Sequence, residues 1–277
     1  MTIIEFEKQN LSAWIPELLQ IARQAGADIM AVYAGADMGT TSKADNSPLT
    51  LADLASHRTI VAGLTQLTPD IPILSEEAAD IPYSVRREWN RFWLVDPLDG
   101  TKEFIKRNGE FTVNIALVEN GKPIMGVVYA PVLDVCYYGV SGEGAFVQRG
   151  KSPAQVISAR TAVADEKIKV VASRSHSDAR TQALLDKLGD HECISMGSSL
   201  KLCLVAEGAA HFYPRLGPTM EWDTAAAHAV VNAAGGVVQD SHGEPLVYNK
   251  PDLHNPEFFV HAKSEARLPV LIRNFQP

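Results

Sequence analysis

The sequence predicts an α/β fold with α+β character in its N-terminal half. In residues 1–150, two amphipathic helical patterns precede several apolar runs joined by tight turns, which is typical of helices packed on an antiparallel-rich sheet. From residue 151 onward, strand and helix patterns alternate, as in an α/β unit. A polar stretch over residues 148–153 separates the two patterns. We therefore expect one domain over residues 1–150 and a second over residues 151–277.

Composition indicates a globular protein that does not bind nucleic acid. The 277 residues are 46% hydrophobic, and the formal net charge is −8, which argues against nucleic acid or anionic lipid as a main partner. No apolar stretch approaches the roughly 20 residues of a membrane-spanning helix, and no signal peptide is evident. The widely spaced Cys136, Cys193 and Cys203 are expected to be reduced core residues. We expect a cytoplasmic protein; peripheral association with the inner face of the cell membrane stays open, as does a monomeric or homodimeric state.

Two helices are expected first. Apolar residues recur over residues 11–33 at the spacing of an amphipathic helix, and a second helix is expected from Thr50 to about residue 67. Thr50 is a suitable N-cap, and Asp53 stands at the third helical position, so the two form a carboxylate variant of the capping box. A short strand over residues 73–74 follows and finishes at Ser75-Glu76-Glu77.

The remaining strands of the first half are expected to form hairpins. A buried strand over residues 92–95 stops at an acidic turn. The runs at residues 111–118 and 123–130 flank Asn120-Gly121, the strongest short-range hairpin signal. A third antiparallel strand is expected over residues 135–140, and another strand starts at residue 145 after a tight turn.

The second half is expected to alternate strands with helices. Ser198 and Ser199 are predicted to cap a helix that ends at residue 206, and Pro269 limits a last short helix. The predicted strands are residues 168–172, 209–213, 237–238 and 258–260, and the other predicted helices are residues 177–188 and 223–234.

The acidic turn Asp96-Pro97-Leu98-Asp99-Gly100-Thr101 is the main candidate for chemistry. Strand ends that open into carboxylate-bearing turns are where α/β folds bind ligands. Pro97 restricts the backbone and Gly100 lets a ligand approach it, so Asp96 and Asp99 present fixed oxygens of the kind that Mg²⁺ prefers. The Leu98 carbonyl is a further candidate ligand, and the N–H groups where Thr101 opens a short helix favour an anion. The alternative is an ordinary turn that caps a short helix.

Three further acids lie at the ends of predicted elements, from which side chains can converge on a cleft. Glu76 follows a strand, while Asp53 and Asp223 stand at helix starts. An ordinary role is open to each of them, because Glu pairs are commonly solvated and Asp is a frequent capping residue. Together with the acidic turn, they predict a site that holds divalent cations beside a phosphate ester.

Other phosphate chemistries fit the sequence less well. Haloacid-dehalogenase-type phosphatases also place an Asp-rich turn after a strand and form an aspartyl-phosphate, but their two aspartates are one residue closer together than Asp96 and Asp99. The sequence contains no P-loop and no dinucleotide-binding GxGxxG after a strand. Its eight histidines show no zinc-site spacing.

Two segments far apart in the chain resemble the signatures of the inositol monophosphatase superfamily of Mg²⁺-dependent, lithium-sensitive phosphatases. They are residues 93–104 (WLVDPLDGTKEF) and 222–236 (WDTAAAHAVVNAAGG), with Glu76-Glu77 upstream of both. Ala227, where many relatives have glycine, is a mild departure. The segments that resemble the bacterial 3′(2′),5′-bisphosphate nucleotidases of this superfamily are residues 42–48, 99–116, 173–176 and 197–201.

The resemblance implies the family's layered αβαβα sandwich and a site that holds two or three Mg²⁺ ions and is inhibited by Li⁺. It implies that Asp53 and Thr101 orient and deprotonate the attacking water. For His176, Gly197, Ser198, Lys201 and Arg215 an ordinary polar loop or helix cap stays open as the alternative. The implied metal ligands are Glu76, Asp96, Asp99, Asp223 and the Leu98 carbonyl, and the implied substrate contacts are Gly100, Thr101, His176, Gly197, Ser198, Lys201, Arg215 and Asp223.

The implied reaction is metal-assisted attack of water on the 3′-phosphate of adenosine 3′,5′-bisphosphate, or of its 5′-phosphosulfate form, without a phosphoenzyme. This would place the protein in sulfate assimilation, with Lys201 and Arg215 holding the 5′-phosphate. The same chemistry on inositol monophosphate or fructose 1,6-bisphosphate stays open, as does a non-catalytic phosphate or nucleotide sensor. The presence of the water-activating pair, Asp53 and Thr101, argues against a sensor.

Overall fold

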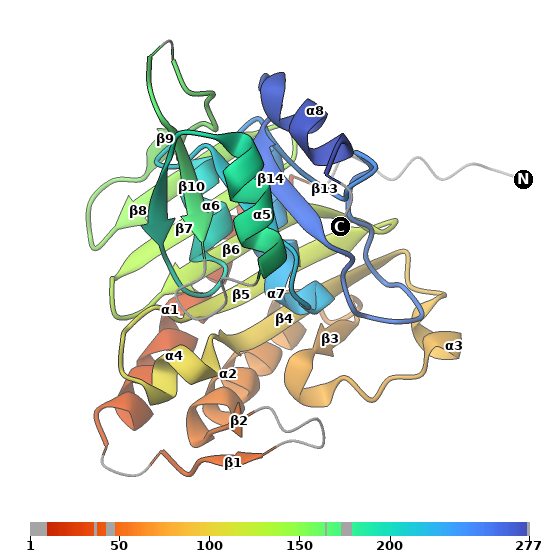
Figure 1. Cartoon of the computed structure of the whole chain (residues 1–277). Helices are drawn as coiled ribbons and strands as arrows, with labels where there is room; N and C mark the ends of the chain where they lie inside the picture. The colour runs from red at the N-terminus through yellow and green to blue at the C-terminus, as the bar shows by residue number, and fades with distance from the viewer. Residues whose placement is uncertain (1–9, 36–37, 43–47, 164, 173–178, 276–277) are drawn as a thin grey trace, which may run out of the picture.

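The computed structural model of the chain describes residues 10–35, 38–42, 48–163, 165–172 and 179–275. Helices and sheets alternate in five layers, which confirms the αβαβα sandwich (Figure 1). Successive side chains of a strand point to opposite faces of the sheet and so pack against the layers on either side. Trp93 and Val95 pack into the first core, for example, whereas Phe92 and Leu94 pack into the second.

The first helical layer consists of α1 (Ile15–Tyr33), which the short 3₁₀ helix η1 (Leu11–Trp14) precedes, and α2 (Leu51–Leu67). Both helices bury apolar side chains against one face of the larger sheet. The predicted capping box of α2 is confirmed, because Ala52 N–H donates to Thr50 Oγ1 (3.2 Å) and Thr50 N–H donates to Asp53 Oδ2 (2.7 Å). Two strands that were not predicted, β1 (Thr41–Ser42) and β2 (Pro48–Leu49), pair just before α2.

The larger sheet has the strand order β3-β4-β5-β6-β7-β8-β9. β3 pairs in parallel with β4, and the pairs that follow are antiparallel. The predicted hairpin between β5 and β6 is confirmed: Asn120 and Gly121 both have positive φ (49° and 74°), as a type I′ turn requires. The strands are β3 (Ile73–Ser75), β4 (Arg91–Asp99), β5 (Thr112–Glu119), β6 (Lys122–Ala130), β7 (Val135–Val140), β8 (Gly144–Arg149) and β9 (Gln155–Ile157).

Helices α6 (Leu200–Ala206) and α7 (Glu221–Ala233) fill the space between the two sheets. α7 passes very close to β6, where Gly126 supplies the room: a Cβ at that position would lie 2.1 Å from the Ala226 carbonyl oxygen. This close packing brings the N-terminal turn of α7 to the edge of the larger sheet where β3 and β4 end.

The smaller sheet has the order β11-β10-β12-β14-β13 and mixes parallel with antiparallel pairs. Helices α5 (Ala179–Leu188) and α8 (Arg267–Arg273) cover its outer face. Its strands are β10 (Ile168–Ala172), β11 (His191–Ser195), β12 (Phe212–Arg215), β13 (Gly236–Gln239) and β14 (Phe258–Ala262).

Several predicted boundaries differ from the structure. β4 does not stop at Val95 but continues to Asp99, and its register with β5 shifts between Asp96 and Asp99, which is where a strand tolerates proline. Pro269 lies in the first turn of α8, where no helical N–H bond is lost. Cys193 is exposed on β11, so its prediction as a core residue is wrong.

The two halves of the chain share one of the cores. β9 lies beyond residue 150 but belongs to the larger sheet, and the core around α6 and α7 takes side chains from both sheets. The division into domains of residues 1–150 and 151–277 stays a prediction. None of the helices in the described parts of the chain is long and apolar enough to cross a membrane.

Candidate active site

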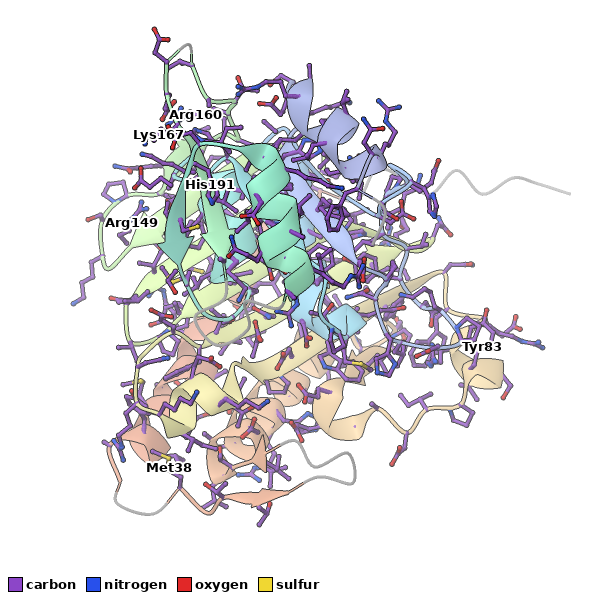
Figure 2. The ribbon with its side chains drawn as sticks, viewed as in Figure 1. Met38, Tyr83, Arg149, Arg160, Lys167 and His191 are labelled. Atoms are coloured by element: carbon purple, nitrogen blue, oxygen red, sulfur yellow. The ribbon has the colours of Figure 1, made fainter. Side chains whose placement is uncertain are left out.

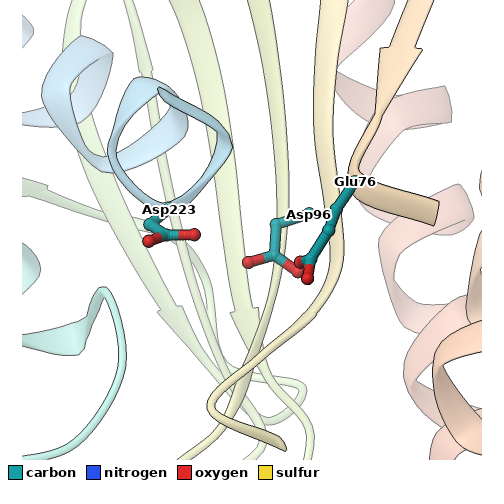
Figure 3. Close-up of side chains that lie close together, drawn as sticks. All are labelled: Glu76, Asp96 and Asp223. Carbon is teal, nitrogen blue, oxygen red and sulfur yellow. The ribbon is translucent and has the colours of Figure 1, made fainter. Parts of the chain in front are cut away.

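Three carboxylates from separate elements meet at one edge of the larger sheet. Glu76 opens the short 3₁₀ helix η2 (Glu76–Ala78) directly after β3, Asp96 lies in β4, and Asp223 lies in the first turn of α7. The parallel register of Ser75 with Val95 places Glu76 beside Asp96. One oxygen atom from each carboxylate lies within 4.8 Å of those of the other two (Figure 3).

This cluster concentrates negative charge where little water reaches it. Asp96 is 1% exposed, and its burial, together with the nearby Glu76, Asp99 and Asp223, raises its pKa well above the usual range. Burial and the charge of Asp99 also raise the pKa of Asp223. Carboxylates at such distances repel one another unless a proton or a cation lies between them, and a donor set of oxygens alone suits Mg²⁺. The residues present therefore fit a divalent-cation site.

Asp99 lies beside the cluster, and the second half of the chain holds its side chain. Its Oδ2 accepts hydrogen bonds from Ser198 Oγ and from the Ser199 N–H, both at 2.6 Å. Asp99 is not one of the three clustered carboxylates. Its role as a metal ligand, like that of the Leu98 carbonyl, stays a prediction.

Asp53 fills the structural role considered for it and also faces the site. Its Oδ2 accepts hydrogen bonds from the Thr50 N–H (2.7 Å) and the Thr50 hydroxyl (2.6 Å), as a capping carboxylate does. Its Oδ1 lies 3.4 Å from the hydroxyl oxygen of Thr101, which begins α4 (Thr101–Ile105). The same hydroxyl lies 3.4 Å from the Leu98 carbonyl oxygen. Asp53 is 2% exposed and can polarise the Thr101 hydroxyl without competition from bulk water.

Gly100 makes the turn that starts α4. Its φ of 93° lies in the left-handed region, which favours glycine, and a Cβ there would lie 3.3 Å from the Glu110 carbonyl oxygen. Gly100 thereby joins the end of β4 to the start of α4, where Thr101 faces Asp53.

A pocket of about 130 Å³ adjoins the carboxylates and contains two cationic side chains, Lys201 and Arg215. The Lys201 ammonium donates to the Ser198 carbonyl (2.6 Å), and burial lowers its pKa to about 8 although Asp99 opposes this shift. Arg215 Nη2 donates to the Pro218 carbonyl (2.9 Å), but its Nε is buried and has no hydrogen-bond partner among the described residues. Cations with such unused donors suit an anionic ligand. The other predicted site residues on the wall are Asp99, Gly100, Gly197, Ser198 and Asp223.

Three residues that hold Asp99 were not identified from the sequence. Thr112 Oγ1 and Asn114 Nδ2 each lie 3.4 Å from Asp99 Oδ2. Ser199, predicted only as a helix cap, donates from Oγ to Asn114 Oδ1 at 2.8 Å. Thr112 and Asn114 occupy alternate positions of a strand that is otherwise apolar up to its last residue, so two polar groups on one buried face were the available signal.

The loop before α6 differs from its prediction as a helix cap. Ser198 and Ser199 were predicted to cap α6, but no side chain caps that helix, because both serines bind in the Asp99 network instead. His176 lies outside the described residues. Gly197 lies where a Cβ would meet the Glu110 carbonyl oxygen at 2.8 Å, so glycine lets this loop reach Asp99.

Comparisons with known proteins give a consistent result. The sequence profile of the inositol monophosphatase family matches residues 10–274. The chain is 56% identical to the 3′(2′),5′-bisphosphate nucleotidase CysQ of Escherichia coli O157:H7 over 250 residues, which are 89% of this chain and 98% of that protein. The crystal structure of CysQ from Bacteroides thetaiotaomicron, described as a bacterial member of the same family, superposes with a TM-score of 0.82 at 46% identity and covers 94% of this chain and 100% of that chain. The extragenic suppressor protein suhB of Bartonella henselae shares the fold, with a TM-score of 0.77 at 24% identity over 95% of this chain and 98% of that chain.

Proposed function

The chain belongs to the inositol monophosphatase family and is a phosphatase, and we propose that it removes the 3′-phosphate of adenosine 3′,5′-bisphosphate with the help of Mg²⁺. The observation that carries this proposal is that one pocket is lined both by carboxylates and by two cationic side chains. Asp99 and Asp223 line it together with Lys201 and Arg215. A substrate with two phosphates suits this lining, because one phosphate can bind metal ions at the carboxylates while the other binds the cationic side chains.

In the proposed reaction, water attacks phosphorus in line with the ribose 3′-oxygen, which leaves as the P–O bond breaks and takes up a proton from solvent water. Mg²⁺ ions at Glu76, Asp96, Asp99, Asp223 and the Leu98 carbonyl would supply charge neutralisation for the phosphoryl oxygens and for the leaving oxygen.

The chain's own groups orient the reactants. Thr101 takes the proton of the attacking water and relays it to Asp53, whose Oδ1 lies 3.4 Å away. The Gly100 and Thr101 N–H groups would hold the phosphate. The products are AMP and inorganic phosphate, and no phosphoenzyme forms.

The 5′-phosphate is assigned to Lys201 and Arg215. The unpartnered Nε of Arg215 supports this assignment, as does the burial of Lys201, because a buried ammonium gains from an anionic partner. His176, Gly197 and Ser198 are proposed to contact the rest of the nucleotide. The 5′-phosphosulfate form of the substrate would fit the same cations. The phosphosulfate can donate its sulfuryl group, and the bisphosphate is what remains after that transfer, so the enzyme would act in sulfate assimilation.

Phosphate release from three compounds tests the proposal. We expect adenosine 3′,5′-bisphosphate to give a kcat/KM at least about 100-fold above those of inositol monophosphate and fructose 1,6-bisphosphate, because the proposed pocket binds the 5′-phosphate together with the rest of the nucleotide. Activity should require Mg²⁺ and fall when Li⁺ is added. A preference for either of the other compounds would overturn the substrate assignment. Tight calorimetric binding of the bisphosphate without turnover would instead favour a sensor.

A further inference from the structure

The first turn of α7, which carries Asp223, is crossed by residues 249–255, here called the strap. Glu221 N–H donates to the Leu253 carbonyl at 2.9 Å. Asn255 Nδ2 donates to the Met220 carbonyl at 2.7 Å. The Met220 N–H in turn donates to Asp223 Oδ2 at 2.8 Å. The strap therefore holds the backbone to which the carboxylate of Asp223 is itself bonded.

The buried carboxylate of Glu221 binds the strap to α7 through hydrogen bonds. Glu221 is 0% exposed and precedes Asp223 by two residues. It accepts hydrogen bonds from the Asn249 N–H (2.6 Å), the Lys250 N–H (3.0 Å) and the Lys250 ammonium (2.6 Å). Such charge-assisted bonds to a fully buried group are strong and directional, so they define where the helix begins.

A buried arginine holds the strap from the other side. Arg86 ends α3 (Tyr83–Arg86), whose first residue is labelled at the edge of the molecule in Figure 2, and it is 3% exposed. Its Nη1 donates to Asn249 Oδ1 (3.0 Å) and the Lys250 carbonyl (2.9 Å), and its Nη2 donates to the Pro251 carbonyl (3.1 Å). Arg86 therefore joins the strap to the segment that begins at Glu76.

Asn249 lies between the two buried charges. Its φ of 67° is in the left-handed region, which asparagine tolerates better than most residues. Its N–H donates to Glu221, and its Nδ2 donates to the Arg86 carbonyl at 2.7 Å. An unfavourable backbone conformation persists only where contacts with the surrounding structure hold it in place. For Asn249 these contacts are its hydrogen bonds to Arg86 and Glu221.

We infer that Arg86, Glu221 and Lys250 are positioning residues for the metal site, an inference that rests on the proposed function. The sheet register alone makes Glu76 a neighbour of Asp96. Asp223 comes from the other half of the chain, and three carboxylates within 4.8 Å repel one another. The strap, tied at Glu221 and Arg86, holds Asp223 against that repulsion, so that the ligands are in place before the cation binds.

Mn²⁺ affinity of the full chain, measured by electron paramagnetic resonance of free Mn²⁺, tests this inference. In Glu221→Gln, Arg86→Lys and Lys250→Met we expect the Kd to rise about 10- to 100-fold, the range found when groups behind metal ligands are changed. Turnover at saturating Mn²⁺ should stay within about threefold of wild type, because the substituted groups touch neither the substrate nor the cation. The three variants remove different parts of the network, so that failure of one to fold leaves two to measure.

Glu166→Gln is the matched control, because it breaks a bidentate pair with Arg160, which lies far from Tyr83 in the view of Figure 2. It should leave the Mn²⁺ affinity at the wild-type value. Folded strap variants that bind Mn²⁺ as tightly as wild type would overturn the inference and leave the proposed function standing. Absence of Mn²⁺ binding by the wild-type protein would overturn the metal site, and the inference with it.

Discussion

At the scale of single residues, Asp96 combines almost complete burial with three acidic neighbours, an arrangement that opposes folding unless a cation or a proton offsets it. Asp96→Asn removes one charge from the cluster and keeps the shape of the side chain. We expect turnover to fall by more than about 100-fold. Substitution of groups that only support a metal ligand already lowers metal affinity or activity by about 10- to 100-fold. The melting temperature in EDTA should not fall. Near-normal turnover would remove Asp96 from the metal site.

Lys201 is expected to make the activity depend on pH. Burial lowers its pKa to about 8, so the ammonium is charged below that pH and loses its charge above it. Hydrogen bonds to charged groups contribute about 1.5–3 kcal/mol, so kcat/KM for the bisphosphate should fall more than about tenfold as the pH rises through this pKa. The same profile for adenosine 3′-phosphate, which lacks the 5′-phosphate, should lack this fall.

The matched variant is Lys201→Arg, whose guanidinium stays charged over the same range. Its profile should stay level through pH 8. An unchanged fall in this variant would assign the titration to another group.

The site residues differed in how well the sequence predicted them. Glu76 and Asp223 each stand at the start of a helix and Asp96 lies within β4, all three in recognisable motifs, and the structure brings them together. Ser199 and Asn114 were not identified, because their hydrogen bond joins residues 85 positions apart and no local spacing predicts such a contact. The left-handed φ of Ser198 (55°), which accompanies its bond to Asp99, had no signal in the residue type either.

At the scale of elements, two polar residues at the start of α2 have different expected roles, one in stability and the other in catalysis. Thr50 caps the helix, whereas Asp53 both accepts the capping bonds and faces Thr101. Thr50→Val should lower the free energy of unfolding by about 0.5–2 kcal/mol, as loss of an N-cap does, with a small change in kcat. Asp53→Asn should instead lower kcat by about 10²- to 10⁴-fold. Equal losses of kcat in the two variants would reduce Asp53 to a capping residue.

The contact between α7 and β6 depends on a glycine. Gly126→Ala would place a Cβ 2.1 Å from the Ala226 carbonyl oxygen, so helix and sheet must separate. Overpacking of this kind costs roughly 1–3 kcal/mol, which urea unfolding can measure. Gly217→Ala, whose Cβ would meet no atom closer than 3.7 Å, is the control and should change the unfolding free energy little. Equal stability of the two variants would contradict the close packing described for α7.

Element prediction succeeded where periodicity is strong and failed at short edges. The long amphipathic pattern of α1 and the Asn-Gly turn between β5 and β6 identify their elements from local physics alone. β9 and β11 are short strands at sheet edges with few buried side chains, and their pairing depends on the neighbouring strand. The extension of β4 to Asp99 was missed for the same reason, since Thr112 on β5 pairs with it across an irregular register.

At the scale of the whole molecule, the five layers bring the site together from distant parts of the chain. Asp53 and Thr101 come from the first half, Lys201 and Arg215 from the second, and α7 connects the halves because its side chains pack against both sheets. The protein carries a net charge of −8 and acts on an anion, so the cations must be concentrated where the substrate binds. In the proposed function, Lys201 and Arg215 on the pocket wall would meet this requirement.

The central claim is that this one pocket removes the 3′-phosphate of a bisphosphate nucleotide by direct attack of water. A single turnover with adenosine 3′,5′-bisphosphate and Mg²⁺, quenched in acid at successive times, tests it most directly. The account predicts that AMP carrying its 5′-phosphate and inorganic phosphate appear together, with no phosphate on the protein at any time. Adenosine 3′-phosphate as the product, or acid-stable phosphate on the protein before AMP is released into solution, would contradict it.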